Sequence, residues 1–102
     1  MKFLIVTCIK ECEELVFGIF KESKIRAYSS TEIVGFKDNQ SPNLLEEWFA
    51  SGDEKFDSSM LFSFTSDENA NNAMNLIITQ NQNNPTNFPI RAFIVPVEKS
   101  SF

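Results

Sequence analysis

The two cysteines, Cys8 and Cys12, are the side chains best suited to hold a metal ion, because soft thiolates near carboxylates suit thiophilic metals. Three carboxylates lie around the second cysteine: Glu11, Glu13 and Glu14. However, Cys8 fits the apolar pattern of an expected strand and Cys12 fits the apolar stripe of an expected helix. Free cysteine is among the most buried residue types. We therefore interpret both as packing residues, with a metal site as the weaker alternative.

Catalysis has little support in the sequence, which contains no histidine. Ser–His and Cys–His pairs, the commonest general base and most familiar zinc and copper sites all depend on histidine. The three glutamates near Cys12 fall in the first turn of an expected helix, where the helix dipole favours carboxylates. With no other arrangement of nucleophile and base, we expect a binding protein rather than an enzyme.

The composition indicates one small acidic domain. A chain of 102 residues suffices for a single domain at 1–102, and its net charge of −5 repels a phosphate backbone. The nine Lys and Arg residues are scattered, so we expect no nucleic-acid binding. The apolar start of the chain ends at Lys10, too soon for a signal peptide or a membrane span. We therefore expect a cytoplasmic protein with reduced thiols and no direct membrane insertion.

Apolar periodicity predicts a β-α-β order that occurs twice. The expected strands are 2–10, 26–36, 58–65 and 90–97, and the expected helices are 11–23 and 67–80, the second capped by Ser66 or Asp67. A long polar connection covers 37–57, and the Asn-rich segment 81–89 is interpreted as a turn. This order predicts an α+β, ferredoxin-like βαββαβ sandwich: a four-stranded antiparallel sheet with two helices on one face and the polar strand 26–36 at an edge.

Three of the four expected strands are apolar on both faces. In the first strand Phe3 and Ile5 alternate with Leu4 and Val6, so each face of the sheet receives large apolar side chains. The last strand repeats this pattern. Only one face can pack against helices of the same chain, and a monomer rarely exposes so large an apolar patch. We therefore expect an oligomer that covers the second face.

The connection 37–57 contains four apolar side chains in a polar setting: Leu44, Leu45, Trp48 and Phe49. They could form one face of a helical turn. Such a turn would either anchor a protein partner, since Trp is enriched in interface hot spots, or fold back onto its own oligomer. The sequence leaves both interpretations open.

Two segments carry a family resemblance. Residues 31–36, Thr-Glu-Ile-Val-Gly-Phe, resemble the Thr-Glu-Val-x-Gly-Phe motif that ends the second strand of PII signal-transduction proteins. Residues 95–98, Val-Pro-Val-Glu, resemble the end of that family's last core strand. The resemblance extends over most of the chain outside 37–57. The CutA metal-tolerance family shares the fold and a Pro-Val-Glu strand, but the first motif favours the PII family.

The resemblance implies a homotrimer whose sheets surround a central axis. It also implies that 37–57 is the T-loop, which responds to a bound effector and contacts a membrane transporter or an enzyme. Effectors in this family occupy clefts between subunits. The candidate effector residues here are Gly35, Phe36 and Lys37, where the connection leaves the strand, and the cations Lys55 and Arg91.

The sequence also departs from the family. ATP-binding PII proteins follow Gly-Phe with Gly-Arg-Gln, whereas residues 37–39 here are Lys-Asp-Asn. Their Gly-rich loop with a lysine before the last strand corresponds to 81–89, which has neither glycine nor cation. Both departures argue against ATP in the usual PII mode. The effector is therefore unknown, and nucleotide, bicarbonate and metal all remain candidates. A metal-binding protein of the CutA or efflux-associated PII-like type is the alternative function.

Overall fold

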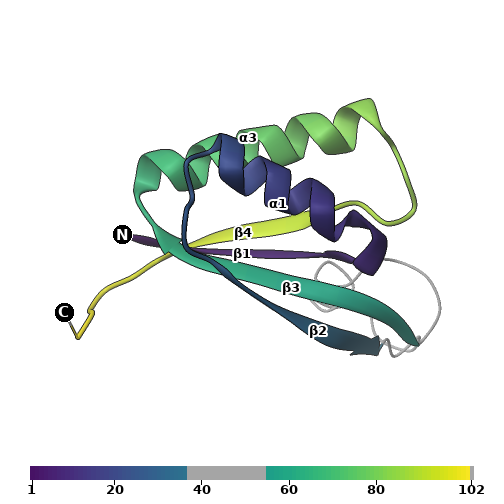
Figure 1. The fold of residues 1–102 in the computed structure, drawn as a ribbon, viewed down its shortest axis with the longest axis horizontal. Coiled ribbons are helices and arrows are strands. Elements are labelled where there is room, and N and C mark those ends of the chain that lie inside the picture. The colour runs from purple at the N-terminus through teal and green to yellow at the C-terminus, as the bar shows by residue number, and fades with distance from the viewer. Residues whose placement is uncertain (37–54, 102) are drawn as a thin grey trace.

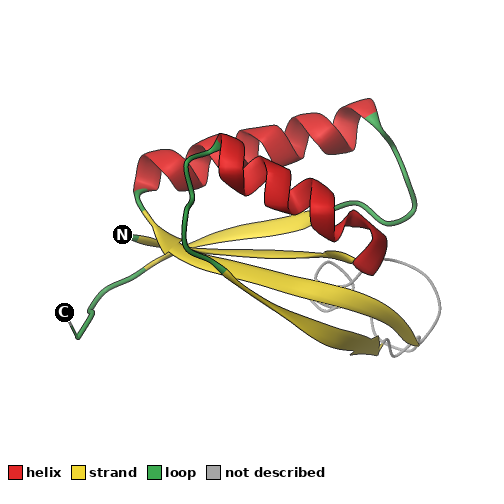
Figure 2. Ribbon diagram, viewed as in Figure 1, coloured by secondary structure: helices red, strands yellow, loops and turns green. Residues whose placement is uncertain are grey.

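The computed structural model describes residues 1–36 and 55–101, which form a four-stranded sheet covered on one face by two helices (Figures 1 and 2). The elements in chain order are β1 (Lys2–Ile9), a 3₁₀ turn η1 (Lys10–Cys12), α1 (Glu13–Glu22), β2 (Ser29–Phe36), β3 (Lys55–Thr65), α3 (Asp67–Asn83) and β4 (Arg91–Pro96). The predicted α+β, ferredoxin-like arrangement is confirmed.

The strand order in the sheet is β2-β3-β1-β4, and every neighbouring pair is antiparallel. The polar strand β2 is at an edge, as predicted. In the central pair, Phe3 lies opposite Phe64 and Ile5 lies opposite Phe62. On its other side β1 places Phe3 opposite Val95 and Ile5 opposite Phe93. Residues that lie opposite each other point to the same face, so this register gathers the apolar side chains of three strands.

The core lies between the sheet and the helices. Alternate residues of β1, Leu4, Val6 and Cys8, are buried there with Leu61 of β3. The first helix contributes its i, i+3, i+4 positions Val16, Ile19 and Phe20, and α3 contributes Ala70, Ala73 and Ile77. The small alanines bring α3 close to the sheet. The spacing of these apolar residues is what selects the helices and orients them.

The ends of α3 differ from each other in how they are fixed. At its start the Ser66 side chain accepts a hydrogen bond from the Asn69 backbone N–H at 3.1 Å, which confirms Ser66 as the N-cap. At its end the helix continues to Asn83, three residues beyond the predicted boundary. Glutamine and asparagine are polar enough to resemble a turn, but in the last helical turn Gln82 and Asn83 are exposed to solvent and Asn81 bonds the backbone of Ile90.

Two strand boundaries also differ from those predicted. Residues 55–57 belong to β3 rather than to the polar connection, because pairing with β2 continues until Lys55 lies opposite Phe36. At the other end, residues 26–28 precede β2 instead of opening it. There the Tyr28 ring packs against α1, with ring centroids 4.9 Å from Phe20 and 5.7 Å from Phe17.

Candidate functional site

The sheet face opposite the helices carries a cluster of large apolar side chains, which we call the open sheet face: Phe3, Ile5, Phe62, Phe64, Phe93 and Val95. Phe64 is 58% exposed, Val95 43% and Phe93 38%. The Phe3 ring stacks on Phe64 at 4.6 Å and meets Phe62 edge-on at 5.8 Å. The expectation that this second face is apolar and uncovered within the described residues is thus confirmed.

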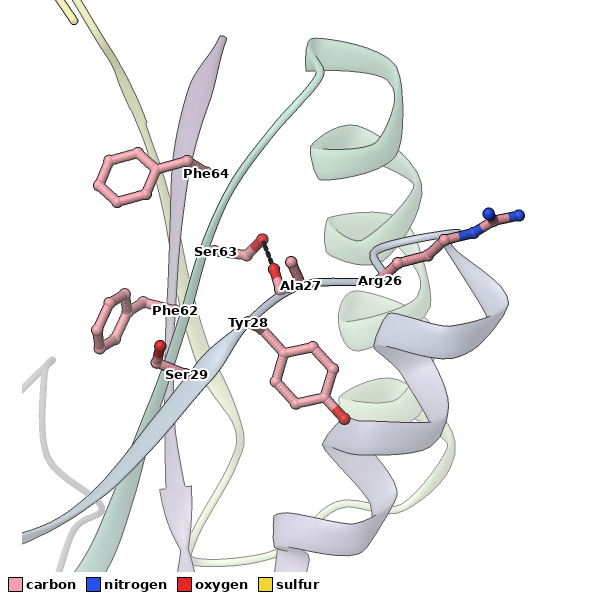
Figure 3. A pocket seen from close by; sticks show the side chains of 7 residues that line it. All are labelled: Arg26, Ala27, Tyr28, Ser29, Phe62, Ser63 and Phe64. Carbon is pink, nitrogen blue, oxygen red and sulfur yellow. Dashed lines mark hydrogen bonds between the residues drawn. The ribbon is translucent and has the colours of Figure 1, made fainter. Parts of the chain in front are cut away.

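A cavity of about 580 Å³ lies beside the open sheet face, where β3 passes the approach to β2 (Figure 3). Phe62 and Phe64 point away from the helices, whereas Tyr28 and Arg26 lie on the helix side. The Ser63 hydroxyl donates a 2.6 Å hydrogen bond to the Ala27 carbonyl and fixes the two segments together. The cavity is therefore lined by residues from both sides of the sheet, with Phe62 and Phe64 on the side away from the helices and Arg26 on the helix side.

The base of the connection 37–54 is a paired hairpin. Gly35 is buried and lies opposite Phe56, and Phe36 lies opposite Lys55. These two pairs fix both ends of the connection at one edge of the sheet. The register places three of the candidate effector residues, Gly35, Phe36 and Lys55, next to one another along the β2–β3 ladder, and their role in binding stays a prediction.

Lys10 and Glu32 form an ion pair near this hairpin base. The Lys10 ammonium lies 2.5 Å from a Glu32 carboxylate oxygen, joining the start of η1 to β2. The hydrogen bond raises the pKa of Lys10 and lowers that of Glu32. A cavity of about 320 Å³ adjoins the pair, lined also by Ile33, Val34, Asp57 and Ser58. Sequence analysis missed Lys10, because its partner is 22 residues away in the chain.

The remaining candidate effector residues do not join this group within one chain. Arg91 opens β4 and lies opposite Thr7 of β1, so it is on the strand at the far edge of the sheet from β2. Lys37 lies outside the described residues, as do the partner-binding candidates Leu44, Leu45, Trp48 and Phe49. Their roles remain predictions.

The cysteines are placed in or near the core. Cys8 is 3% exposed, and burial, with the nearby Cys12 and Glu13, raises its pKa to about 12. Cys12 is half-buried, and burial also raises its pKa. Metal coordination requires the thiolate, which these surroundings disfavour. Among the described residues no group of three or more Cys, Asp and Glu side chains is arranged to hold a metal ion.

Two other polar candidates have structural roles. Glu13 accepts a 2.5 Å hydrogen bond from the Ser59 hydroxyl, which ties α1 to β3. In the Asn-rich segment, Asn81 bonds both backbone groups of Ile90: its amide donates to the carbonyl at 2.8 Å, and its oxygen accepts from the N–H at 3.0 Å. Asn81 therefore holds the chain in place just before β4.

A third cavity, beside α1, was not anticipated from the sequence. It has a volume of about 620 Å³ and lies between the last turns of α1 and the approach to β2. Its cations Lys21, Lys24 and Arg26 are scattered among other residue types in the sequence, and the turn that gathers them is not evident from composition. Of its two aromatic residues, Phe17 falls in the predicted helix 11–23 and Tyr28 in the segment 26–36 predicted as strand, so the contact between them is not evident from the sequence.

Neither protein-family models nor curated protein sequences match this chain. Among solved structures it is similar to a protein of Thermus thermophilus described as a PII-like signalling protein. The TM-score is 0.57 at 14% sequence identity, and the match covers 91% of this chain and 82% of that one. The chain has a PII-like fold. The fold expected from residues 31–36 and 95–98 is thereby confirmed. At 14% identity the similarity shows the fold alone.

Neither α1 nor α3 is both long and apolar enough to span a membrane, and this holds for all helices in the described residues.

Proposed function

We propose that this protein is a PII-like regulator rather than an enzyme. It forms a homotrimer through the open sheet face, binds a small effector in clefts between subunits, and contacts a protein partner through residues 37–54. The observation that carries this proposal is the apolar face opposite the helices on a PII-like fold. A monomer in water would expose the rings of Phe64 and Phe93, whereas a trimer packed around a central axis would bury them.

The hairpin base supports the signalling part of the proposal. Because Phe36 and Lys55 are paired, a change at this base reaches both ends of the connection at once. An effector that contacts the base would favour one arrangement of the connection over another, and the partner would bind one of them. Trp48 and Phe49 are the proposed anchors for the partner, which would be a membrane transporter or an enzyme of the cytoplasm.

The effector site in this proposal contains residues of two subunits. Gly35 and Phe36 end the edge strand β2, Lys55 begins the neighbouring strand β3, and Arg91 opens β4 at the other edge of the sheet. Subunits arranged around an axis would bring unlike edges of neighbouring sheets together, so that a cleft could receive the hairpin base of one chain and Arg91 of the next. Lys37, Lys55 and Arg91 suit an anionic effector.

A metal-binding function has weaker support. Burial keeps Cys8 protonated, with a pKa of about 12, and a zinc or copper ion would have to displace that proton in the core. Titration of the protein with divalent metals, repeated with Cys8→Ser and Cys12→Ser, distinguishes the two functions. Loss of tight metal binding in either variant would instead support a metal site at these thiols.

The oligomer is tested by light scattering after gel filtration. The proposal requires a molar mass three times that of the 11.6 kDa chain. A monomer at all concentrations would refute it. The effector is then sought by thermal shift with nucleotides, bicarbonate, metabolites and divalent metals, because a ligand that binds only the folded state raises its melting temperature. A hit that is lost in both Lys55→Gln and Arg91→Gln, and retained in Lys99→Gln, would locate the site.

A further inference from the structure

The cavity of about 620 Å³ beside α1 has an aromatic wall of fixed orientation. Phe17 and Tyr28 line it, and their ring centroids are 5.7 Å apart. Tyr28 is held from behind by Phe20, which is fully buried and meets it nearly perpendicularly at 4.9 Å. Tyr28 itself is 39% exposed. A planar apolar group in the cavity would therefore find a rigid aromatic surface.

Three cations line the same cavity as these two rings. Lys21, Lys24 and Arg26 all line the cavity, and no carboxylate does. The ion pairs among the described residues are Lys2–Asp67 and Lys10–Glu32, so none of the three forms an ion pair with a described acidic side chain. In a chain of net charge −5, one third of its nine cations is gathered here. This local reversal of charge complements an anion.

The turn that ends α1 holds one of these cations, Lys24, in an unfavourable backbone conformation. Lys24 has φ = 64°, in the left-handed region where glycine is usual. The Ile25 N–H bonds the Phe20 carbonyl at 2.9 Å and the Lys24 N–H bonds the Lys21 carbonyl at 3.1 Å, which is the Schellman pattern. A lysine at this position is less favourable than glycine for the fold, yet its side chain lines the cavity.

Glycine occurs instead where the fold does not require it. Gly18 lies inside α1 and lines the same cavity, and a Cβ atom built on it meets no atom within 4 Å. Glycine inside a helix is less stable than alanine. Packing among the described residues therefore gives no reason for glycine at this position, whereas a group that approaches the helix backbone closely would need it.

We infer that this cavity is a binding site for a small anionic molecule with an aromatic ring. The ring would lie against Phe17 and Tyr28, beside Gly18, and its carboxylate or phosphate would be held by Lys21, Lys24 and Arg26. The volume is within the roughly 300–1,000 Å³ typical of small-molecule sites. Arg26 offers a planar fork of donors that fits either anionic group.

This site goes beyond the proposed function and does not depend on it. All its lining residues come from one chain, so it exists whether or not the protein forms a trimer. Of the candidate effector residues Gly35, Phe36, Lys55 and Arg91, none lines it. Failure of the trimer in light scattering and failure of this site in the experiment below are therefore separate results.

The test is a titration followed by backbone amide NMR. The probes are naphthoate and naphthyl phosphate, with the neutral naphthamide as the matched control ligand. The chain has three glycines, so the Gly18 amide falls in a sparsely populated region of the spectrum. We expect both anions to shift the Gly18, Lys24 and Tyr28 signals, and the neutral amide to bind at least about tenfold more weakly. The tighter anion identifies the preferred head group.

Matched variants separate the site from general charge and size effects. Arg26→Gln should weaken binding of the better anion by about tenfold or more, whereas Lys99→Gln removes the same charge at an exposed position after β4 and should leave binding unchanged. Gly18→Leu should abolish binding by filling the cavity, and Asn75→Leu, the control on an exposed position of α3, should not. Three results would overturn the proposal: no shifts with either anion, equal binding of the neutral amide, or shifts confined to the open sheet face.

Discussion

Phe3 of β1 and Phe64 of β3 lie directly opposite each other on the open sheet face, and their rings stack at 4.6 Å with 21° between their planes. Two large rings stacked on a face away from the helices contribute nothing to the core between sheet and helices. Exposing these rings to water is unfavourable, whereas burying them against another sheet is favourable. In the proposed trimer this pair would lie in the interface between subunits.

A charge at Phe64 should prevent this association. In Phe64→Glu, a carboxylate would have to be buried without a partner in the trimer, which costs several kcal/mol per subunit. We expect light scattering to give the molar mass of one chain, with the far-UV circular dichroism unchanged. Glu68→Gln, an exposed change at the start of α3, is the control and should leave the trimer intact. A trimer that persists in Phe64→Glu would place the interface elsewhere.

The sheet and its two faces could be predicted from the sequence because side chains in a strand alternate with a period of two. That period separates Leu4 and Val6 from Phe3 and Ile5 without any knowledge of the partner strands. The edge position of β2 followed from its polar residues. Ser66 could be recognised as a cap because its type and its place before an apolar helical stripe agree.

The details that the sequence could not supply come from contacts between distant segments. Lys55 looks like part of a polar loop, and only pairing with Phe36 makes it a strand residue. Lys10 and Glu32 meet because η1 and β2 are brought together by the sheet. The predicted end of the first helix at Ser23 is within one residue of the observed end at Glu22, but the left-handed residue that follows could not be recognised because it is Lys24 rather than glycine. The roles of Trp48 and Phe49 stay predictions.

Asn81 should be important for the placement of β4. Its side chain satisfies both backbone groups of the buried Ile90, and Asn81→Ala would leave the N–H and the carbonyl without these partners. We expect a loss of about 1–3 kcal/mol in the free energy of unfolding, measured with urea. Asn81→Asp keeps the acceptor for the Ile90 N–H but sets a carboxylate oxygen against the Ile90 carbonyl, so it should also lower stability. An Asn81→Ala variant as stable as the parent would mean that the two hydrogen bonds contribute nothing.

The buried thiol of Cys8 should make stability depend on pH in the alkaline range. Its pKa is raised from 9.0 to about 12 in the folded protein, so the folded state retains the proton more tightly than the unfolded chain. This contribution is fully present below pH 9 and is lost as the pH rises toward 12. Cys8→Ala should be less stable than the parent at pH 7, with a difference that narrows above about pH 9. A difference that is constant with pH would contradict the raised pKa.

The pair formed by Lys10 and Glu32 should contribute stability over a wide pH range. The pKa of Glu32 is lowered, so its contribution is present above about pH 4.5 and is lost as the pH falls through the folded-state value. The pKa of Lys10 is raised, so its contribution is present below pH 10.5 and is lost as the pH rises further. Glu32→Gln should therefore lower the melting temperature slightly at pH 7 and have a smaller effect at about pH 3. Thr31→Val at the neighbouring exposed position should show no such pH dependence.

The glycine at 18 and the lysine at 24 should both be suboptimal for stability. Gly18→Ala adds a methyl group in open space and should raise the free energy of unfolding by about 0.5–1 kcal/mol. Lys24→Gly should relieve the left-handed conformation, which costs a residue with a side chain about 1 kcal/mol. Urea unfolding of both variants measures these gains, and Lys21→Gly, in the last turn of α1, should instead destabilise by about 1 kcal/mol. If neither variant gains stability, the fold itself requires these two residues, and they no longer indicate a ligand.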